Sequence, residues 1–177
     1  MTHRRATHTD AEAIARLHIA SWQSAYRGLI PDPILDAVDV ETRIGYWESH
    51  IADPATVVLL AQAANIPIGF CASGPSRDQD AEPAKTWEIY NLHVAPDRRD
   101  RGIGAALFDA AVRLGRDREA AKATLWVITG NRAARRFYER KGMIRDISRH
   151  TLSESFGVFI DETRYRTRIG DAVTKTP

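Results

Sequence analysis

The most constraining feature of this sequence is a strand, a polar loop and a long helix that follow one another directly. Trp87 to Val94 is rich in apolar and aromatic residues and predicts a buried strand, and Ala95 to Arg101 is polar. Small and apolar residues then recur at helical spacing: Ile103, Leu107, Ala110, Ala111 and Leu114. The unit predicts a sheet strand that passes through a loop into the first turn of an amphipathic helix.

Helix signals precede this unit. Thr9, followed three residues later by Glu12, is the pattern of a capping box, and apolar or aromatic residues follow at helical spacing: Ile14, Leu17, His18 and Trp22. Asp32-Pro33 predicts a second helix start. A third helix is indicated by an apolar stripe of Ile44, Trp47 and Ile51.

Strand signals lie on both sides of the central unit. Thr56 to Ala61 and Ile68 to Ala72 flank turn residues and predict a hairpin, and residues 73–85 form a polar loop. Later elements are a strand Ala123 to Ile128, a helix Arg132 to Arg140 closed by Gly142, and strands around Met143 to Thr151 and Gly157 to Arg168. This order predicts a mixed α/β fold with helices on both faces of the sheet.

Length and composition exclude several classes of protein. The 177 residues suit one domain, and the contents of 44% hydrophobic and 27% charged residues suit a soluble globular chain. The sequence contains neither a membrane-spanning apolar run nor a secretory signal, so we expect a cytoplasmic protein. Cys71 is the single cysteine, expected to be buried in a strand, and a net charge of +2 gives no reason to expect nucleic acid.

The loop Arg99-Asp100-Arg101-Gly102-Ile103-Gly104 has the chemistry of a phosphate site. Free N–H groups at a helix start point at an anion, and glycines let the backbone approach it. The loop is neither a P-loop nor the usual dinucleotide fingerprint, because it lacks Gly-Lys-Ser/Thr and the first glycine. By itself the pattern also fits a solvated surface turn.

The wider context resembles a known family. Asn91 to Leu107 resembles motif A of the GNAT superfamily of N-acetyltransferases, and Leu125-Trp126-Val127 with Asn131, Ala134, Phe137-Tyr138 and Gly142 is similar to motif B. Segments around Ala20 to Pro31 and Glu162 to Arg166 also resemble this superfamily. The resemblance implies one domain spanning residues 1–177, with a central, mostly antiparallel sheet that splays between its two middle strands. It implies acetyl-CoA as cosubstrate and no metal.

The same resemblance implies roles for particular residues. Main-chain groups of Leu92, His93 and Val94 would bind the pantetheine arm, and the loop from Arg99 through Asp100, Arg101, Gly102 and Ile103 to Gly104 would bind the pyrophosphate. Asn131 is expected to cap its helix and to contact the same arm. Tyr138 matches the usual general acid, although aromatic packing on an amphipathic helix is the alternative. Asp100 departs from the pattern, since the family often has glycine there.

Two further parts of the site are less constrained. Glu88 is a candidate base, with a water chain or a solvent-facing carboxylate as alternatives. Four aromatic residues are candidate walls of an acceptor pocket or, alternatively, core residues: Trp22, Tyr26, Tyr46 and Trp47. The expected acceptor is a small-molecule amine. A protein or peptide amine and a coenzyme A-binding sensor without turnover remain open, and we expect no nucleic-acid or membrane partner but consider a homodimer.

Overall fold

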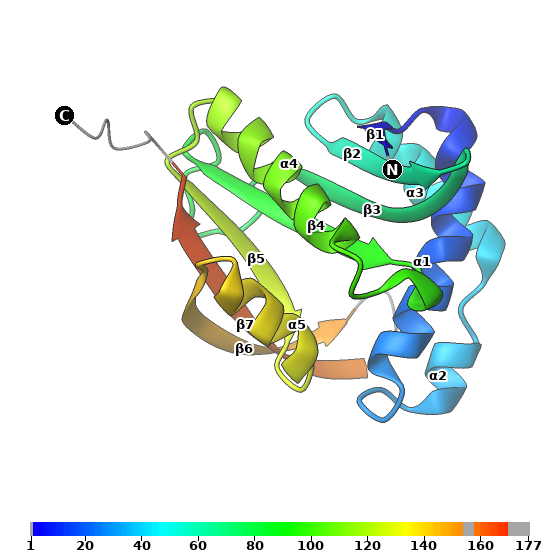
Figure 1. The fold of residues 1–177 in the computed structure, drawn as a ribbon. Helices are drawn as coiled ribbons and strands as arrows, with labels where there is room; N and C mark the ends of the chain where they lie inside the picture. The colour runs from blue at the N-terminus through cyan, green and yellow to red at the C-terminus, as the bar shows by residue number, and fades with distance from the viewer. Residues whose placement is uncertain (1, 154–157, 170–177) are drawn as a thin grey trace. The chain divides into compact units, whose positions relative to one another are not determined.

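The computed structural model describes residues 2–153 and 158–169 (Figure 1). Seven strands form a mostly antiparallel sheet with one parallel pair, in the order β1-β2-β3-β4-β5-β7-β6. The strands are β1 (Thr2–Arg5), β2 (Val57–Ala63), β3 (Ile66–Pro75), β4 (Thr86–Val94), β5 (Lys122–Ile128), β6 (Ile144–Ser153) and β7 (Val158–Arg168). The α-helices are α1 (Ala11–Tyr26), α2 (Asp32–Asp36), α3 (Val40–Ala52), α4 (Ile103–Asp117) and α5 (Arg132–Arg140), with short 3-10 helices η1 (His8–Asp10) and η2 (Pro96–Arg98).

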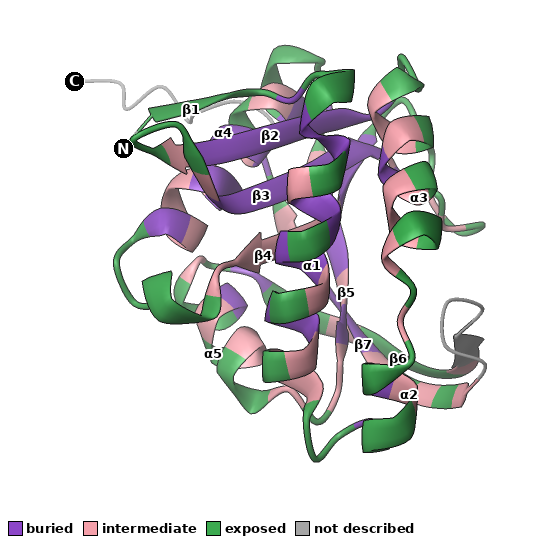
Figure 2. Cartoon of the chain, turned by 90° about the vertical axis from the view of Figure 1, so that its right-hand side faces the viewer, coloured by how far each residue is buried: buried purple, intermediate pink, exposed green. Residues whose placement is uncertain are grey.

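The chain divides into two compact units. The first contains Met1–Ser73 and Asn91–Phe108, in which β1, β2 and β3 pair antiparallel. Buried residues run along β2 and β3 (Figure 2). On one face of β3, Phe70 packs against His18 of α1 and Trp47 of α3. On the other face α4 lies close, since a Cβ added to Gly69 would meet the Ile103 side chain at 3.1 Å. Successive strand residues face opposite ways, so helices cover both faces of this part of the sheet.

The second unit contains Gly74–Tyr90 and Asp109–Pro177. Here β4 pairs parallel to β5, which pairs antiparallel to β7, which in turn pairs antiparallel to β6. Trp87 packs beside α4 so closely that a Cβ on Gly115 would lie 2.6 Å from its ring. On the same face the phenol of Tyr165 donates to Glu139 of α5 at 2.7 Å. One face of this unit is therefore packed against helices.

Most predicted elements occur where the sequence indicated them, including the buried strand position of Cys71. Two differences have simple causes. Strand β1 was not predicted, because its four residues are all exposed and show no apolar alternation. The capping box lies at Thr7 and Asp10 rather than at Thr9 and Glu12, because η1 precedes α1. Gly157, the predicted start of the last strand, lies outside the described residues.

The core beneath α1 contains two histidines. Rings of His18 and His93 lie 4.5 Å apart, His93 Nδ1 lies 2.8 Å from Ser21 Oγ, and the Trp47 indole donates to His18 Nδ1 at 3.2 Å. Burial, with a smaller contribution from nearby Arg99, lowers the pKa of His93 to about 3. Burial also holds the pKa of His18 well below its ordinary value. Both imidazoles are therefore neutral at physiological pH.

These two histidines predict a loss of stability on mild acidification. Below pH of about 6.5 the unfolded chain binds protons that the native imidazoles exclude, so each site lowers the free energy of unfolding by about 1.36 kcal/mol per pH unit. The loss should continue until the pH reaches the native pKa, which is about 3 for His93. Urea unfolding at pH 7, 6 and 5 measures it. A His93→Asn variant should show about half the slope, and equal stability at pH 7 and 5 would contradict the assignment.

Candidate functional site

The loop between β4 and α4 has a backbone that explains its sequence. Asp100 has φ +60° and Gly102 has φ +77°, and α4 begins at Ile103. Positive φ favours glycine, and aspartate is among the few other residues that tolerate it, so Asp100 can occupy a position where the family often has glycine. A Cβ built on Gly102 meets no atom within 4 Å, so this face of the loop is open. The loop can thus present the first N–H groups of α4 to an anion.

The arginines around the loop differ in what they contact. Arg99 donates from Nη2 to the carbonyl oxygen of Ser21 at 3.1 Å, which ties the loop to α1. Arg98 Nε lies 3.0 Å from Asp97 rather than pairing with Asp100. Across residues 2–153 and 158–169, Asp100 makes no ion pair. Arg99 therefore positions the loop as well as contributing charge.

Strand β4 leads into this loop and carries the predicted pantetheine-binding residues. The side chain of His93 packs against Phe70 and Ser21 in the first unit. The parallel register between β4 and β5 runs from Thr86↔Lys122 to Ile89↔Leu125 and ends there. Main-chain groups of Leu92 and Val94 therefore lie beyond the part of β4 that pairs with β5.

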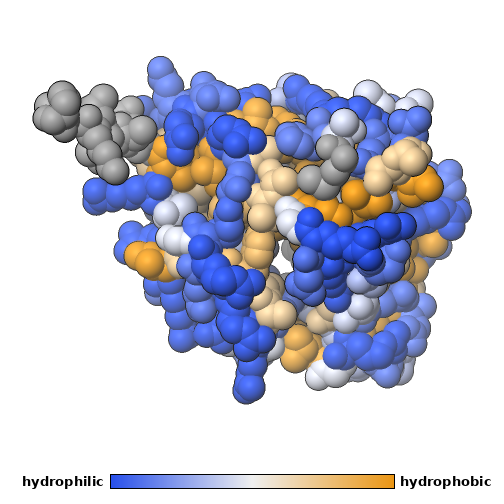
Figure 3. Space-filling view, in the orientation of Figure 1, coloured by the Kyte–Doolittle hydropathy of each residue, from blue (hydrophilic) through white to orange (hydrophobic). Residues whose placement is uncertain are grey.

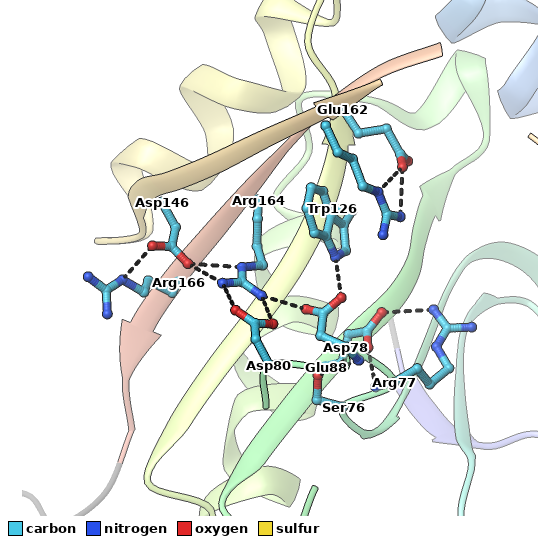
Figure 4. A network of polar contacts seen from close by, with 11 residues as sticks. Ser76, Arg77, Asp78, Asp80, Glu88, Trp126, Asp146, Glu162, Arg164 and Arg166 are labelled. Carbon is cyan, nitrogen blue, oxygen red and sulfur yellow. Dashed lines mark hydrogen bonds and ion pairs between the residues drawn. The ribbon is translucent and has the colours of Figure 1, made fainter. Parts of the chain in front are cut away.

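Glu88, the candidate base, is buried and held by neighbours in the second unit (Figure 4). Its Oε1 accepts from Arg77 Nη2 at 2.8 Å, and its Oε2 accepts from the Arg77 backbone N–H at 2.8 Å and from Ser76 Oγ at 3.4 Å. The Arg77 guanidinium also lies over the ring of Tyr90, 3.9 Å from its centroid. A carboxylate has about four acceptor positions, so this arrangement leaves one for a proton donor.

Asn131 and Tyr138 lie on either end of α5. The Asn131 side chain accepts from the Ala134 N–H at 3.0 Å, which confirms the predicted N-cap. Tyr138 is buried, with its ring 5.2 Å from Phe137 and 6.5 Å from Tyr165. These contacts fix the position of the phenol within the second unit.

The four aromatic residues considered for an acceptor pocket fall into two groups. Trp47 and Trp22 are buried, with 0% and 5% exposure, and belong to the core of the first unit. Tyr26 and Tyr46 are half-buried; Tyr26 lies edge-on to Trp22, and Tyr46 stacks on His50 at 3.9 Å. The two tyrosines have the surface that contact with an acceptor requires.

Sequence analysis missed the partners of Glu88 and the network next to it. Ser76 and Arg77 lie in a loop whose composition gives no sign of a carboxylate partner, and the pairing appears only when the chain folds back. Residues 2–153 and 158–169 contain no cluster of three or more metal-ligating side chains. No helix in these ranges is long and apolar enough to cross a membrane.

Comparison with known proteins shows which sequences this chain is similar to. The sequence profile of the Acetyltransferase (GNAT) family matches residues 15–143. An uncharacterized N-acetyltransferase from Archaeoglobus fulgidus is 31% identical over 151 residues, which cover 85% of this chain and 98% of that protein.

Solved structures show the same fold. YncA from Salmonella typhimurium, a protein solved with acetyl-CoA, superposes with a TM-score of 0.72 at 19% identity, covering 99% of this chain and 98% of the other. A ribosomal-protein-alanine N-acetyltransferase from Brucella melitensis gives 0.71 at 22% identity, covering 95% and 99%.

The open loop at the start of α4 fits the pyrophosphate of acetyl-CoA, which would be held by Arg101, Gly102, Ile103 and Gly104. When bound, acetyl-CoA supplies the activated acetyl group. With the match over residues 15–143 and the relative from Archaeoglobus, the conclusion is that this chain belongs to the GNAT family of acetyltransferases and is an acetyl-transfer enzyme that uses acetyl-CoA.

Proposed function

We propose that the enzyme transfers acetyl from acetyl-CoA to the primary amine of a small molecule by direct attack, with Tyr138 as general acid. The observation that carries this proposal is the end of β4–β5 pairing after Ile89↔Leu125, three positions before Leu92. Main-chain N–H groups released from a ladder can bind the pantetheine arm like an added strand, and one can stabilise the oxyanion of the tetrahedral intermediate.

The proton inventory of the reaction requires a base and an acid. A lysine-like amine of pKa about 10.4 is protonated at pH 7, and losing that proton costs about 4.6 kcal/mol at 1.36 per pH unit. Glu88 has one acceptor position left and is only 3% exposed, so we propose that it takes the proton through a water. The phenol of Tyr138 then protonates the departing thiolate as its charge builds up.

An amine screen with thiol detection tests this function. Purified protein is incubated with acetyl-CoA and a panel of small amines and of peptides with free N-termini or lysines, and release of free coenzyme A is followed. We expect thiol release with a small amine. Release with peptides alone would instead identify a protein acetyltransferase, and thermal stabilisation by acetyl-CoA without any release would identify a sensor. The assignment to the cytoplasm and a homodimer both stay predictions.

Asp100 provides a prediction of improved cofactor binding. Its carboxylate lies in the loop expected to hold the pyrophosphate, and the two negative charges would repel each other. We take the size of this effect from that of one anionic charge near a helix start, about 0.3–1 kcal/mol. Asp100→Asn removes the repulsion and keeps a side chain that tolerates φ +60°. The KM for acetyl-CoA should fall about two- to fivefold.

Steady-state kinetics at low and high salt measure this change, and the gain should shrink as salt screens the repulsion. Asp97→Asn is the matched control, because Asp97 is an exposed carboxylate that pairs with Arg98 outside the positive-φ turn. An equal gain in both variants would show a general charge effect rather than a local one.

A further inference from the structure

One face of the sheet in the second unit is polar. Register places Thr86 beside Lys122 and places Thr124 beside Arg166, so these side chains share a face. They line a cavity of about 260 Å³ together with Asp80, Ala81, Asp146 and Arg164. The packed face of the same unit, with Trp87 and Tyr165, points the other way. The charged and hydroxyl side chains of this face therefore do not belong to the apolar core of the unit.

The acidic groups of this cavity are already occupied. Arg164 uses its five N–H donors on three carboxylates: Nη1 contacts Asp78 at 3.1 Å and Asp80 at 2.6 Å, Nη2 contacts Asp80 at 2.7 Å and Asp146 at 2.7 Å, and Nε contacts Asp146 at 2.9 Å (Figure 4). The remaining oxygen of Asp146 lies 3.3 Å from Arg166 Nε. A cation entering the cavity would compete with these arginines.

Several hydrogen-bond donors that line the cavity, in contrast, are not used by the carboxylates. The hydroxyls of Thr86 and Thr124 are buried and have no hydrogen-bond partner within the described ranges 2–153 and 158–169. Lys122 is half-buried, and its ammonium makes no ion pair or hydrogen bond with any residue in 2–153 or 158–169. Arg166 is 52% exposed, and its Nε forms an ion pair with Asp146. A buried hydroxyl without a partner is unfavourable, and such a group in a native protein often marks an ion or water site.

We propose that this cavity binds a small oxyanion, a phosphate or carboxylate group, through Lys122, Arg166, Thr86 and Thr124. Such a group carries only acceptors, which is what a cavity with spare donors and occupied carboxylates can recognise. The ion pairs of Arg164 hold the opposite wall in place. This site is made entirely from strands β4, β5, β7 and β6 and the loop 76–85, and it involves none of the residues proposed for acetyl transfer.

Thermal unfolding with phosphate tests the site. The protein is first saturated with coenzyme A so that the cofactor loop is filled, and inorganic phosphate or acetate is then titrated against sodium chloride of equal ionic strength. We expect phosphate at ten times its dissociation constant to raise Tm by about 3–6 °C. Stabilisation by acetate as well would show that a carboxylate is sufficient, whereas stabilisation by phosphate alone would restrict the ligand to phosphate.

Two variants and one control locate the effect. Lys122→Met should abolish the phosphate shift, whereas Lys85→Met, which removes the same charge from an exposed position, should keep it. Thr124→Val should raise Tm by about 2 °C or more without phosphate, because it removes an unpartnered hydroxyl, and should lose most of the phosphate shift. The proposal is overturned if phosphate acts no better than chloride, if the shift survives Lys122→Met, or if Lys85→Met loses it equally.

Discussion

Replacing Tyr138 with phenylalanine should lower kcat by about 10²- to 10⁴-fold, the range for loss of a general acid. The thiolate of coenzyme A leaves with a pKa near 8.5 by analogy with cysteine, and a phenol of pKa about 10 can protonate it only as charge develops. The ring keeps its packing against Phe137 and Tyr165 in the variant, since only the hydroxyl is removed. The KM for acetyl-CoA should therefore change little.

Tyr165→Phe is the matched control for this experiment. Tyr165 is also a buried tyrosine of the second unit, but its hydroxyl accepts from Arg135 at 3.1 Å and donates to Glu139 at 2.7 Å within a structural network. Its loss should lower Tm and leave kcat close to the native value. An unchanged kcat in Tyr138→Phe would remove Tyr138 as the acid, and a raised KM with native kcat would make it a binding contact instead.

Replacing Arg164 with methionine should lower the free energy of unfolding by about 3–5 kcal/mol, the range for breaking a buried ion pair. Arg164 and Asp78 are each only 9% exposed at their side chains, and Asp146 is 17% exposed. Without the guanidinium these carboxylates repel one another with little solvent to screen them. Its hydrogen bonds to Asp80, Asp146 and Asp78 raise the pKa of Arg164 above its ordinary value, so its charge is permanent.

Chemical unfolding measures this loss, and Arg16→Met is the control. Arg16 pairs with Glu12 one helical turn away, with both side chains more than 60% exposed, and its removal should cost no more than about 0.5 kcal/mol. Adding Asp80→Asn and Asp146→Asn to Arg164→Met should restore part of the lost stability. Native stability in Arg164→Met alone would mean that the cluster is held mainly by other contacts.

The polar character of the surface could be predicted from composition. Hydrophilic residues cover most of the face shown in Figure 3, in keeping with the 27% charged content. Local signals were also reliable. Asn131 caps α5 because a cap involves residues three apart, and the loop before α4 is readable because its glycine and aspartate specify the positive φ angles that the turn requires.

The structure adds most to the sequence analysis where local signals are weak. Strand β1 has only exposed polar residues, so its formation depends on pairing with β2, which begins more than fifty positions later. The acceptor-wall prediction treated four aromatics alike, whereas burial distinguishes Trp22 and Trp47 from Tyr26 and Tyr46. Periodicity identifies the inward side of a helix but not how deeply each residue lies.

Local sequence patterns were enough to predict the order of the elements, the loop proposed to hold the pyrophosphate and the candidate roles of Tyr138 and Glu88, because each pattern involves residues close together in the chain. Which charged side chains meet became known only from the fold. Arg164 and Asp78 are 86 positions apart and Glu88 and Arg77 are 11 apart, yet each pair lies within hydrogen-bond distance. Charged side chains are compatible with many partners, and strand register, which the whole sheet fixes together, selects one.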